Sequence, residues 1–225
     1  MLNKNVRKIE DDVLSACETS HRSRKEVQVI AVTKTVSSEE AKELIDLGVV
    51  NLAENRVDKL LEKQQALSDV PQITWHLIGN LQRRKVKTVI NRIDYFHALE
   101  SLSLAEEINK RAEQCIRCFV EVNVSGEVNK HGIPLEEVQT FIQALEYYDK
   151  IQVVGLMTMA PYQANETIIQ SIFSKLKQKQ VEIKQQNWHH APCTELSMGM
   201  SQDYKIAIQE GATFVRIGTA FFSAE

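Results

Sequence analysis

One lysine stands where an amine could act as a nucleophile. Lys34 comes just after the run 28–32, which is apolar from its second residue and is followed by Thr33. At the carboxyl end of a buried strand, loss of solvent favours the neutral amine, which attacks carbonyl carbons. A solvated lysine in a loop is the alternative. The position of Lys34 alone leaves both interpretations open.

A second group of residues suits an anion. Ser201 closes the segment 197–201 and precedes a stretch of helical period, while Gly218 and Thr219 follow the last apolar run. The Ser201 hydroxyl and nearby backbone N–H groups could hold a phosphate, although a serine before a helix is more often only an N-cap. An amine and a phosphate site on neighbouring loops would suit a phosphorylated aldehyde.

Eight short apolar runs are expected to form the parallel strands that carry these residues. Their ranges are 28–32, 49–53, 73–78, 95–99, 118–124, 153–157, 195–198 and 213–217. Helical periodicity lies between them, for example at 82–90, 135–145 and 203–209. Ser37 with Glu40 predicts a capping box, and Ser103 with Glu106 predicts the same cap for a helix that begins near Ser101.

The alternation predicts an α/β fold, a (β/α)8 TIM barrel. An open doubly wound sheet is less favoured, because few residues follow the last strand and no G-x-G-x-x-G motif follows the first. Closure would pair the eighth strand with the first and bring Gly218 beside Lys34. We expect residues 1–225 to form one domain. An extra N-terminal helix, on the flank of the barrel or over one end, is predicted by Val6, Ile9, Val13 and Leu14.

The composition is that of an ordinary globular chain. Of 225 residues, 43% are hydrophobic and 25% are charged, and the net charge of −3 argues against nucleic-acid or membrane partners. No signal peptide or spanning segment is recognised, so we expect a cytoplasmic protein. The four cysteines are expected to be free thiols. Cys115 and Cys118 have half of a zinc motif, but without a second cysteine pair we expect no metal site.

Six blocks, in order, resemble the signature of the pyridoxal-phosphate homeostasis protein family. They are 31–35 (AVTKT), 54–57 (ENRV), 75–79 (WHLIG) with 81–82 (LQ), 155–161 (GLMTMAP), 196–203 (LSMGMSQD) and 215–219 (VRIGT). That family is similar to the N-terminal barrel of bacterial alanine racemases, the fold type III of pyridoxal-phosphate proteins. The resemblance therefore implies the same barrel and pyridoxal 5′-phosphate as the cofactor.

The resemblance also implies residue roles. Lys34 would form the Schiff base, and Arg216 would face the pyridine nitrogen, where a cation disfavours ring protonation and weakens the electron sink. The remaining implied cofactor residues are Asn55 close to the ring, Ser201, Gly218 and Thr219 at the phosphate, and Met200 as a neighbour of the phosphate.

Two classes of function follow. The first is a monomeric protein that binds and buffers pyridoxal phosphate, delivers it to apoenzymes, and has little or no catalytic activity. Alanine racemases take a tyrosine base from a further C-terminal domain, whereas this chain ends at Glu225, shortly after the last strand. The second is an enzyme that also uses Lys34, either a minimal amino-acid racemase or a lysine-dependent aldolase acting on a sugar phosphate.

Three further residues have open roles. His76 ends the third expected strand and could act as a general acid or base, but we expect a structural role. Lys130 and His131 follow the fifth expected strand. Their loop could be a lid or a docking surface for cofactor transfer, and a solvated connection is an equally good interpretation.

Overall fold

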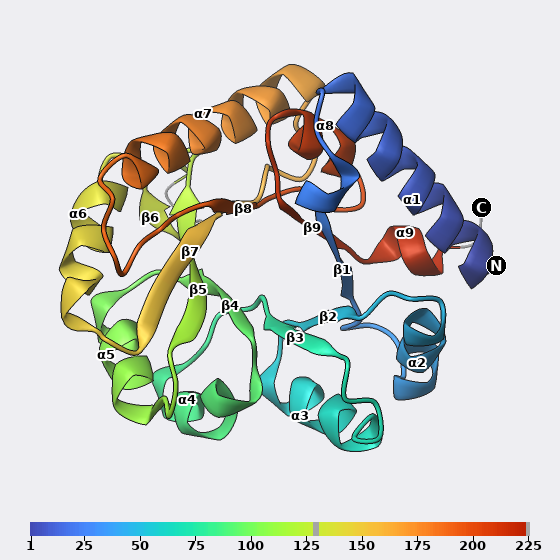
Figure 1. Cartoon of the computed structure of the whole chain (residues 1–225), viewed down its shortest axis with the longest axis horizontal. Coiled ribbons are helices and arrows are strands. Elements are labelled where there is room, and N and C mark those ends of the chain that lie inside the picture. Colours follow the sequence, from blue (N-terminus) through green and yellow to red (C-terminus); the bar gives the residue numbers. More distant parts are fainter. Residues whose placement is uncertain (128–130, 224–225) are drawn as a thin grey trace.

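The computed structural model describes residues 1–127 and 131–223 and shows a closed barrel of parallel strands surrounded by helices (Figure 1). Within the described residues the barrel order is β4-β3-β2-β1-β9-β8-β7-β5, and β4 pairs with β5 to close it. The barrel strands are β1 (Gln28–Val32), β2 (Asn51–Glu54), β3 (Thr74–Leu77), β4 (Tyr95–Leu99), β5 (Ile116–Asn123), β7 (Ile151–Met157), β8 (Glu195–Ser197) and β9 (Phe214–Ile217). The predicted fold class is confirmed.

Helices connect successive strands and cover the outside of the barrel (Figure 1). The α-helices are α1 (Leu2–Thr19), α2 (Ser38–Asp46), α3 (Val57–Ala66), α4 (Arg83–Val89), α5 (Leu102–Arg111), α6 (Val138–Ala144), α7 (Glu166–Lys184), α8 (Tyr204–Gln209) and α9 (Thr219–Phe222). Short 3-10 helices are η1 (Arg24–Glu26), η2 (Ile90–Arg92) and η3 (Leu145–Tyr147). Among the described residues, no helix is both long and apolar enough to cross a bilayer.

The register between the first and last barrel strands brings two distant loops together. Ala31 pairs with Ile217 in the parallel β1–β9 ladder, so both strands end at the same level. Parallel strands present their carboxyl ends at one face of a barrel, the face that carries functional sites in this fold. The loops after Val32 and Ile217 are therefore neighbours, as the sequence predicts.

The N-terminal helix α1 packs on the flank of the barrel, against the last two helices. Asn5 Nδ2 donates to the carbonyls of Phe221 and Ser223 at 2.8 and 3.1 Å, which caps the end of α9. Tyr204 on α8 donates its hydroxyl hydrogen to Asp12 at 2.7 Å. The helix thus buttresses α8 and α9, and of the two predicted positions the flank is the observed one.

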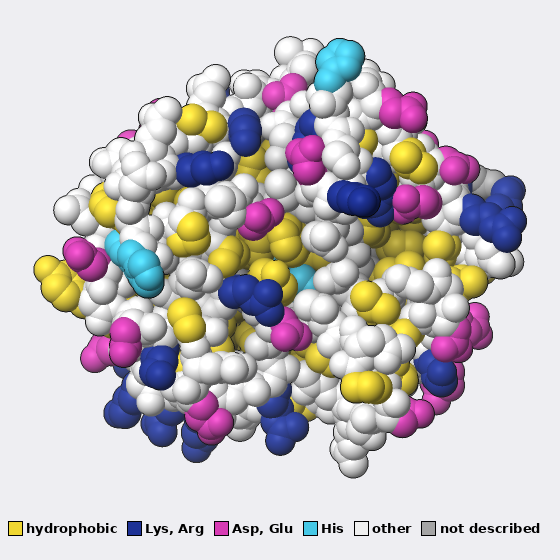
Figure 2. Space-filling model, viewed as in Figure 1, with side chains coloured by type: hydrophobic (Ala, Val, Ile, Leu, Met, Phe, Trp, Pro, Cys, Tyr) yellow, Lys and Arg dark blue, Asp and Glu magenta, His cyan; other side chains and the backbone are white. Residues whose placement is uncertain are grey.

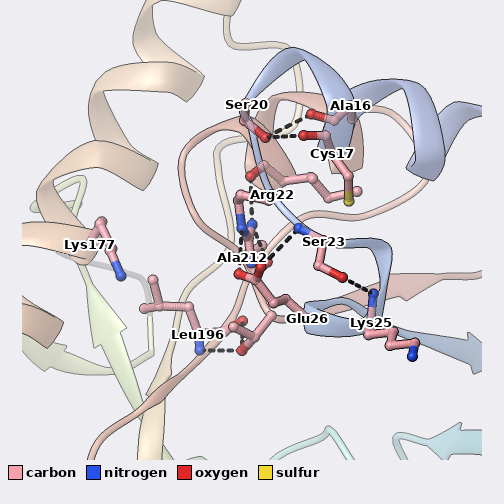
Figure 3. A network of polar contacts seen from close by, with 12 residues as sticks. Ala16, Cys17, Ser20, Arg22, Ser23, Lys25, Glu26, Lys177, Leu196 and Ala212 are labelled. Atoms are coloured by element: carbon pink, nitrogen blue, oxygen red, sulfur yellow. Dashed lines mark hydrogen bonds and ion pairs between the residues drawn. The ribbon is translucent and has the colours of Figure 1, made fainter.

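Arg22 fastens the segment after α1 to the other end of the chain. Its Nη1 donates to the carbonyls of Ile208 and Ala212, both at 2.8 Å, and its Nε donates to Glu26 at 3.3 Å (Figure 3). Ser23 caps η1 and completes a capping box with Glu26. These contacts place the entry into β1 directly beside the connection from α8 to β9.

Some predicted element ends are wrong. The capping box of Ser37 and Glu40 is confirmed, but α5 is capped by Ser101, whose Oγ accepts from Leu104 N at 3.3 Å. Ser103 lies inside that helix, because the chain already turns two residues after β4 and the first serine takes the cap position. A short strand, β6 (Ile133–Pro134), which the sequence pattern does not predict, pairs with the end of β5.

Candidate functional site

Lys34 lies at the carboxyl-end rim, in the turn that follows β1. Val36 N donates to Thr33 O at 3.2 Å and closes this turn around Lys34. Thr33 is buried, whereas Lys34 is exposed. The predicted position at the rim is confirmed, but the expected desolvation of the amine is not present, because the side chain extends beyond the last buried layer of the strand.

The loop after β9 packs directly against the end of β1. A Cβ atom placed on Gly218 would lie 3.4 Å from Val32 Cβ and 3.5 Å from Val32 O, so the backbone of this loop runs in contact with the strand that carries Lys34. Thr219 follows as the first residue of α9 and is exposed. Gly218, Thr219 and Lys34 therefore belong to one stretch of the rim.

Ser201 joins the loop after β8 to the loop after β9. Its Oγ accepts from Gly218 N at 3.1 Å and from Ala220 N at 3.2 Å. Two backbone N–H groups thus converge on a single hydroxyl oxygen, which is the kind of donor cluster that binds a phosphate oxygen. Met200, half-buried beside it, donates its N–H to Asp203 Oδ1 at 2.6 Å and fixes the start of the next turn.

Arg216 places a buried cation inside the barrel. Its Nη1 donates to Ser197 Oγ at 2.6 Å and its Nη2 donates to Thr158 O at 3.0 Å. Burial lowers the pKa of Arg216 to about 10, and the carboxylates of Glu121 and Asp203 oppose that shift. The guanidinium therefore stays charged at neutral pH.

Glu121 on β5 is a carboxyl group that the sequence analysis missed. It is 6% exposed, and burial together with nearby Glu100 raises its pKa to about 7, while Arg216 acts in the opposite direction. A charged residue inside the mostly apolar run 118–124 was the available signal. Near neutral pH this carboxyl changes its protonation state within electrostatic range of Arg216.

A buried polar chain runs from Arg216 through the barrel interior. Ser197 Oγ lies 2.8 Å from His97 Nδ1, His97 Nε2 lies 3.0 Å from His76 Nδ1, and His76 Nε2 lies 3.0 Å from Asn51 Oδ1. Burial lowers the pKa of His76 to about 3 and that of His97 well below its usual value, so both rings are neutral.

The groups at the two ends of this row of hydrogen bonds determine which atom donates in each of them. Asn51 Oδ1 can only accept, so His76 donates through Nε2–H and accepts at Nδ1. His97 then donates through Nε2–H and accepts the Ser197 hydroxyl hydrogen at Nδ1. Arg216 has only donors and supplies the hydrogen that the Ser197 oxygen accepts. The histidine pair His76 and His97 therefore anchors Arg216, and the structural role expected for His76 is the observed one; its ring lies within the barrel and not at the rim.

Asn55 is exposed and immediately follows β2, the strand next to β1. The loop after β3 approaches it closely, since a Cβ on Gly79 would lie 2.1 Å from Asn55 O. Only glycine fits at that position without displacement of the backbone. Asn55 thus lies at the same rim as Lys34, and the loop after β3 packs against its backbone.

The loop with Lys130 lies outside the described residues. The neighbouring His131 is described, and its Nδ1 lies 3.2 Å from Glu100 Oε1. The Gly132 N–H donates to the same carboxylate at 2.8 Å. These contacts tie the return of the loop to the end of β4.

A hollow of about 810 Å³ lies at the opposite end of the barrel from Lys34. Its lining includes residues that begin their strands: Gln28, Asn51, Thr74, Tyr95, Glu195 and Phe214. Figure 2 looks onto the barrel end-on and shows hydrophobic side chains at its centre with charges of both signs around them. A hollow of about 380 Å³ lies beside the rim site and is lined in part by Ser201 and Ala220.

Comparisons with known proteins show the family of this chain. Residues 14–225 match the family model described as alanine racemase, N-terminal domain. A pyridoxal phosphate homeostasis protein of Aquifex aeolicus is 36% identical over 93% of this chain and 92% of its own length. The protein of that name from Escherichia coli K12 is 31% identical over 98% of this chain and 95% of its own length.

Solved structures show the same fold. PipY of Synechococcus elongatus with pyridoxal 5′-phosphate (PLP) bound has a TM-score of 0.87 at 28% identity, covering 99% of this chain and 100% of that one. An alanine racemase of Clostridium difficile has a TM-score of 0.75 at 15% identity and covers 96% of this chain but 56% of that one, a likeness of fold. The chain belongs to the pyridoxal phosphate homeostasis protein family and has the fold of the alanine racemase N-terminal domain.

Proposed function

We propose that the chain binds pyridoxal 5′-phosphate through a Schiff base on Lys34 and holds the cofactor as a buffer and donor, with little or no catalysis. Lys34 would hold the cofactor through its aldehyde: the amine nitrogen and the aldehyde carbon would form a double bond, and the aldehyde oxygen would leave as water with the two amine hydrogens. In this proposal the protein acts as a cytoplasmic monomer, and apoenzymes that need the cofactor are its acceptors.

The contact between the loops after β1 and β9 is the observation that carries the proposal. Gly218 packs against Val32, and Ser201 gathers the N–H groups of Gly218 and Ala220 beside the turn that holds Lys34. An aldehyde and a phosphate on one small molecule need an amine and an anion site on adjacent loops. The relatives are named pyridoxal phosphate homeostasis proteins and the PipY structure has the cofactor bound, which supports the same ligand.

Arg216 supports a carrier over a catalyst. A charged guanidinium next to a pyridine nitrogen disfavours protonation of that nitrogen, and the unprotonated ring is a poorer electron sink. Ser197 and Thr158 hold the guanidinium in place, and in this proposal it faces the pyridine nitrogen of the cofactor. Asn55 would contact the ring from the β2 side, with Met200 and Thr219 near the phosphate.

Absorbance and turnover test the proposal together. The purified protein with pyridoxal 5′-phosphate should be yellow, and Lys34→Ala should be colourless. Lys42→Ala is the matched control, because Lys42 is an exposed lysine on α2 that pairs with Asp46. Racemisation of alanine above about one turnover per second would make the chain an enzyme and refute the carrier role.

A further inference from the structure

A buried ion pair lies directly behind the turn that carries Lys34. Lys63 on α3 is 5% exposed and Glu54 at the end of β2 is fully buried, and Lys63 Nζ lies 2.6 Å from Glu54 Oε1. The same Nζ donates to Thr33 O at 2.5 Å. A helix on the outside of the barrel thus reaches the residue that precedes Lys34.

Thr33 is held at each of its polar groups. Its N–H donates to Ala53 O at 3.0 Å, and its hydroxyl donates to Glu54 Oε1 at 2.7 Å. Its carbonyl oxygen accepts from Lys63 and from Val36, which closes the turn. The peptide group between Thr33 and Lys34 therefore has a fixed orientation, and so does the direction in which the Lys34 side chain leaves the backbone.

Stability alone does not explain this buried ion pair. Removal of two charges from water is expensive, and well-packed apolar residues often stabilise a core as much as a buried ion pair does. Glu54 Oε2 is buried and has no hydrogen-bond partner among the described residues, which adds a desolvation penalty. A buried, incompletely satisfied pair calls for a reason other than packing.

We propose that Lys63 and Glu54 are positioning residues: they hold the Thr33–Lys34 peptide so that the exposed Lys34 amine stays at the part of the rim where Ser201 accepts from Gly218 N. The inference rests on the proposed function of Lys34. Lys63 itself touches no ligand and is not a second Schiff-base lysine, because its Nζ is buried and bonded to Glu54 and Thr33.

Backbone order at the turn tests this inference without any ligand. The double variant Glu54→Leu/Lys63→Met removes the pair and leaves no uncompensated charge. We expect the ¹⁵N order parameters of Lys34 and Thr35 to fall from about 0.85 to below about 0.6, with order in β1 unchanged. The control is Lys59→Met, which removes an exposed lysine on α3 that pairs with Glu62. Order parameters that stay at the wild-type value in the double variant would overturn the proposal.

Cofactor binding supplies the second readout. Stopped-flow absorbance should show Schiff-base formation slowed at least about tenfold in the double variant and unchanged in Lys59→Met. If the double variant does not fold, Thr33→Val replaces it as the test, because this substitution removes the hydroxyl donor to Glu54. Schiff-base formation should be about threefold slower in Thr33→Val. In Thr33→Ser, which keeps the hydroxyl, it should proceed at the wild-type rate. An equal rate in Thr33→Val and the wild type would then count against positioning. If the wild type forms no Schiff base, the proposed function fails, while the order parameters still decide the geometry.

Discussion

The Ser201 hydroxyl offers a direct perturbation of the proposed phosphate site. Ser201→Ala removes an oxygen that accepts two backbone N–H groups, at 3.1 and 3.2 Å. Each neutral hydrogen bond contributes about 0.5–1.5 kcal/mol, so the free energy of unfolding should fall by about 1–3 kcal/mol. In a chain of this length that corresponds to a melting temperature lower by roughly 2–12 °C.

Ser201→Ala should also weaken the binding of the cofactor. In the proposed site, loss of the hydroxyl also removes one donor to the phosphate, an interaction with a charged group. Part of that loss is recovered because the N–H groups of Gly218 and Ala220 become free to bind the ligand. We expect a net loss of about 1–2 kcal/mol, or about 5- to 30-fold in the dissociation constant.

Equilibrium titration of the absorbance of bound pyridoxal 5′-phosphate measures this change, and thermal unfolding of the same samples measures stability. Ser103→Ala is the control, because Ser103 is an exposed serine on α5, which follows β4, three strands away from β1 in the barrel order. Unchanged cofactor affinity in Ser201→Ala would refute the role of this hydroxyl in the phosphate site, even if the variant were less stable.

Three further predictions concern the interior and the loops. Ser197→Ala leaves an Arg216 donor and a histidine acceptor buried without partners, so urea unfolding should show a loss of about 2–4 kcal/mol. The histidine pair stays neutral when folded, so stability should decrease as the pH falls from 6.5 towards about 3, by up to about 1.4 kcal/mol per pH unit and histidine. The measurement should use Glu121→Gln as the background, because the raised pKa of Glu121 makes the folded protein more stable as the pH falls from about 7 to 4.5, which opposes the histidine effect. A flat profile of stability against pH in that variant would show that the rings are not held neutral. Gly79→Ala puts a Cβ into Asn55 O and should destabilise the protein by more than about 1 kcal/mol, and unchanged stability would contradict the observed close approach.

The strand pattern of the barrel was largely predictable from the sequence. The ranges 28–32 and 95–99 coincide with β1 and β4, because buried parallel strands are continuous apolar runs with sharp ends. The second strand is displaced towards Glu54, a charged residue that the apolar pattern excludes from a strand. Its burial depends on Lys63, which comes from a different element, so local pattern could not reveal it.

The proximity of the rim residues was predictable from the topology of the barrel. Closure of the barrel alone places the loop with Gly218 beside the end of β1, and the serine before α8 accepts from Gly218 N. The polar chain behind Arg216 was not predictable, because a histidine in an apolar strand is compatible with either a structural or a catalytic role. Only the three-dimensional contacts of His97 with Ser197 and His76 show that the two rings anchor the arginine.

The identity of the modified lysine tests the central claim most directly. The protein is mixed with pyridoxal 5′-phosphate, reduced with borohydride and digested, and the peptides are analysed by mass spectrometry. Our account predicts one phosphopyridoxyl group, on Lys34, in the peptide that contains the end of β1. A stable label on another lysine, with Lys34 unmodified, would contradict it.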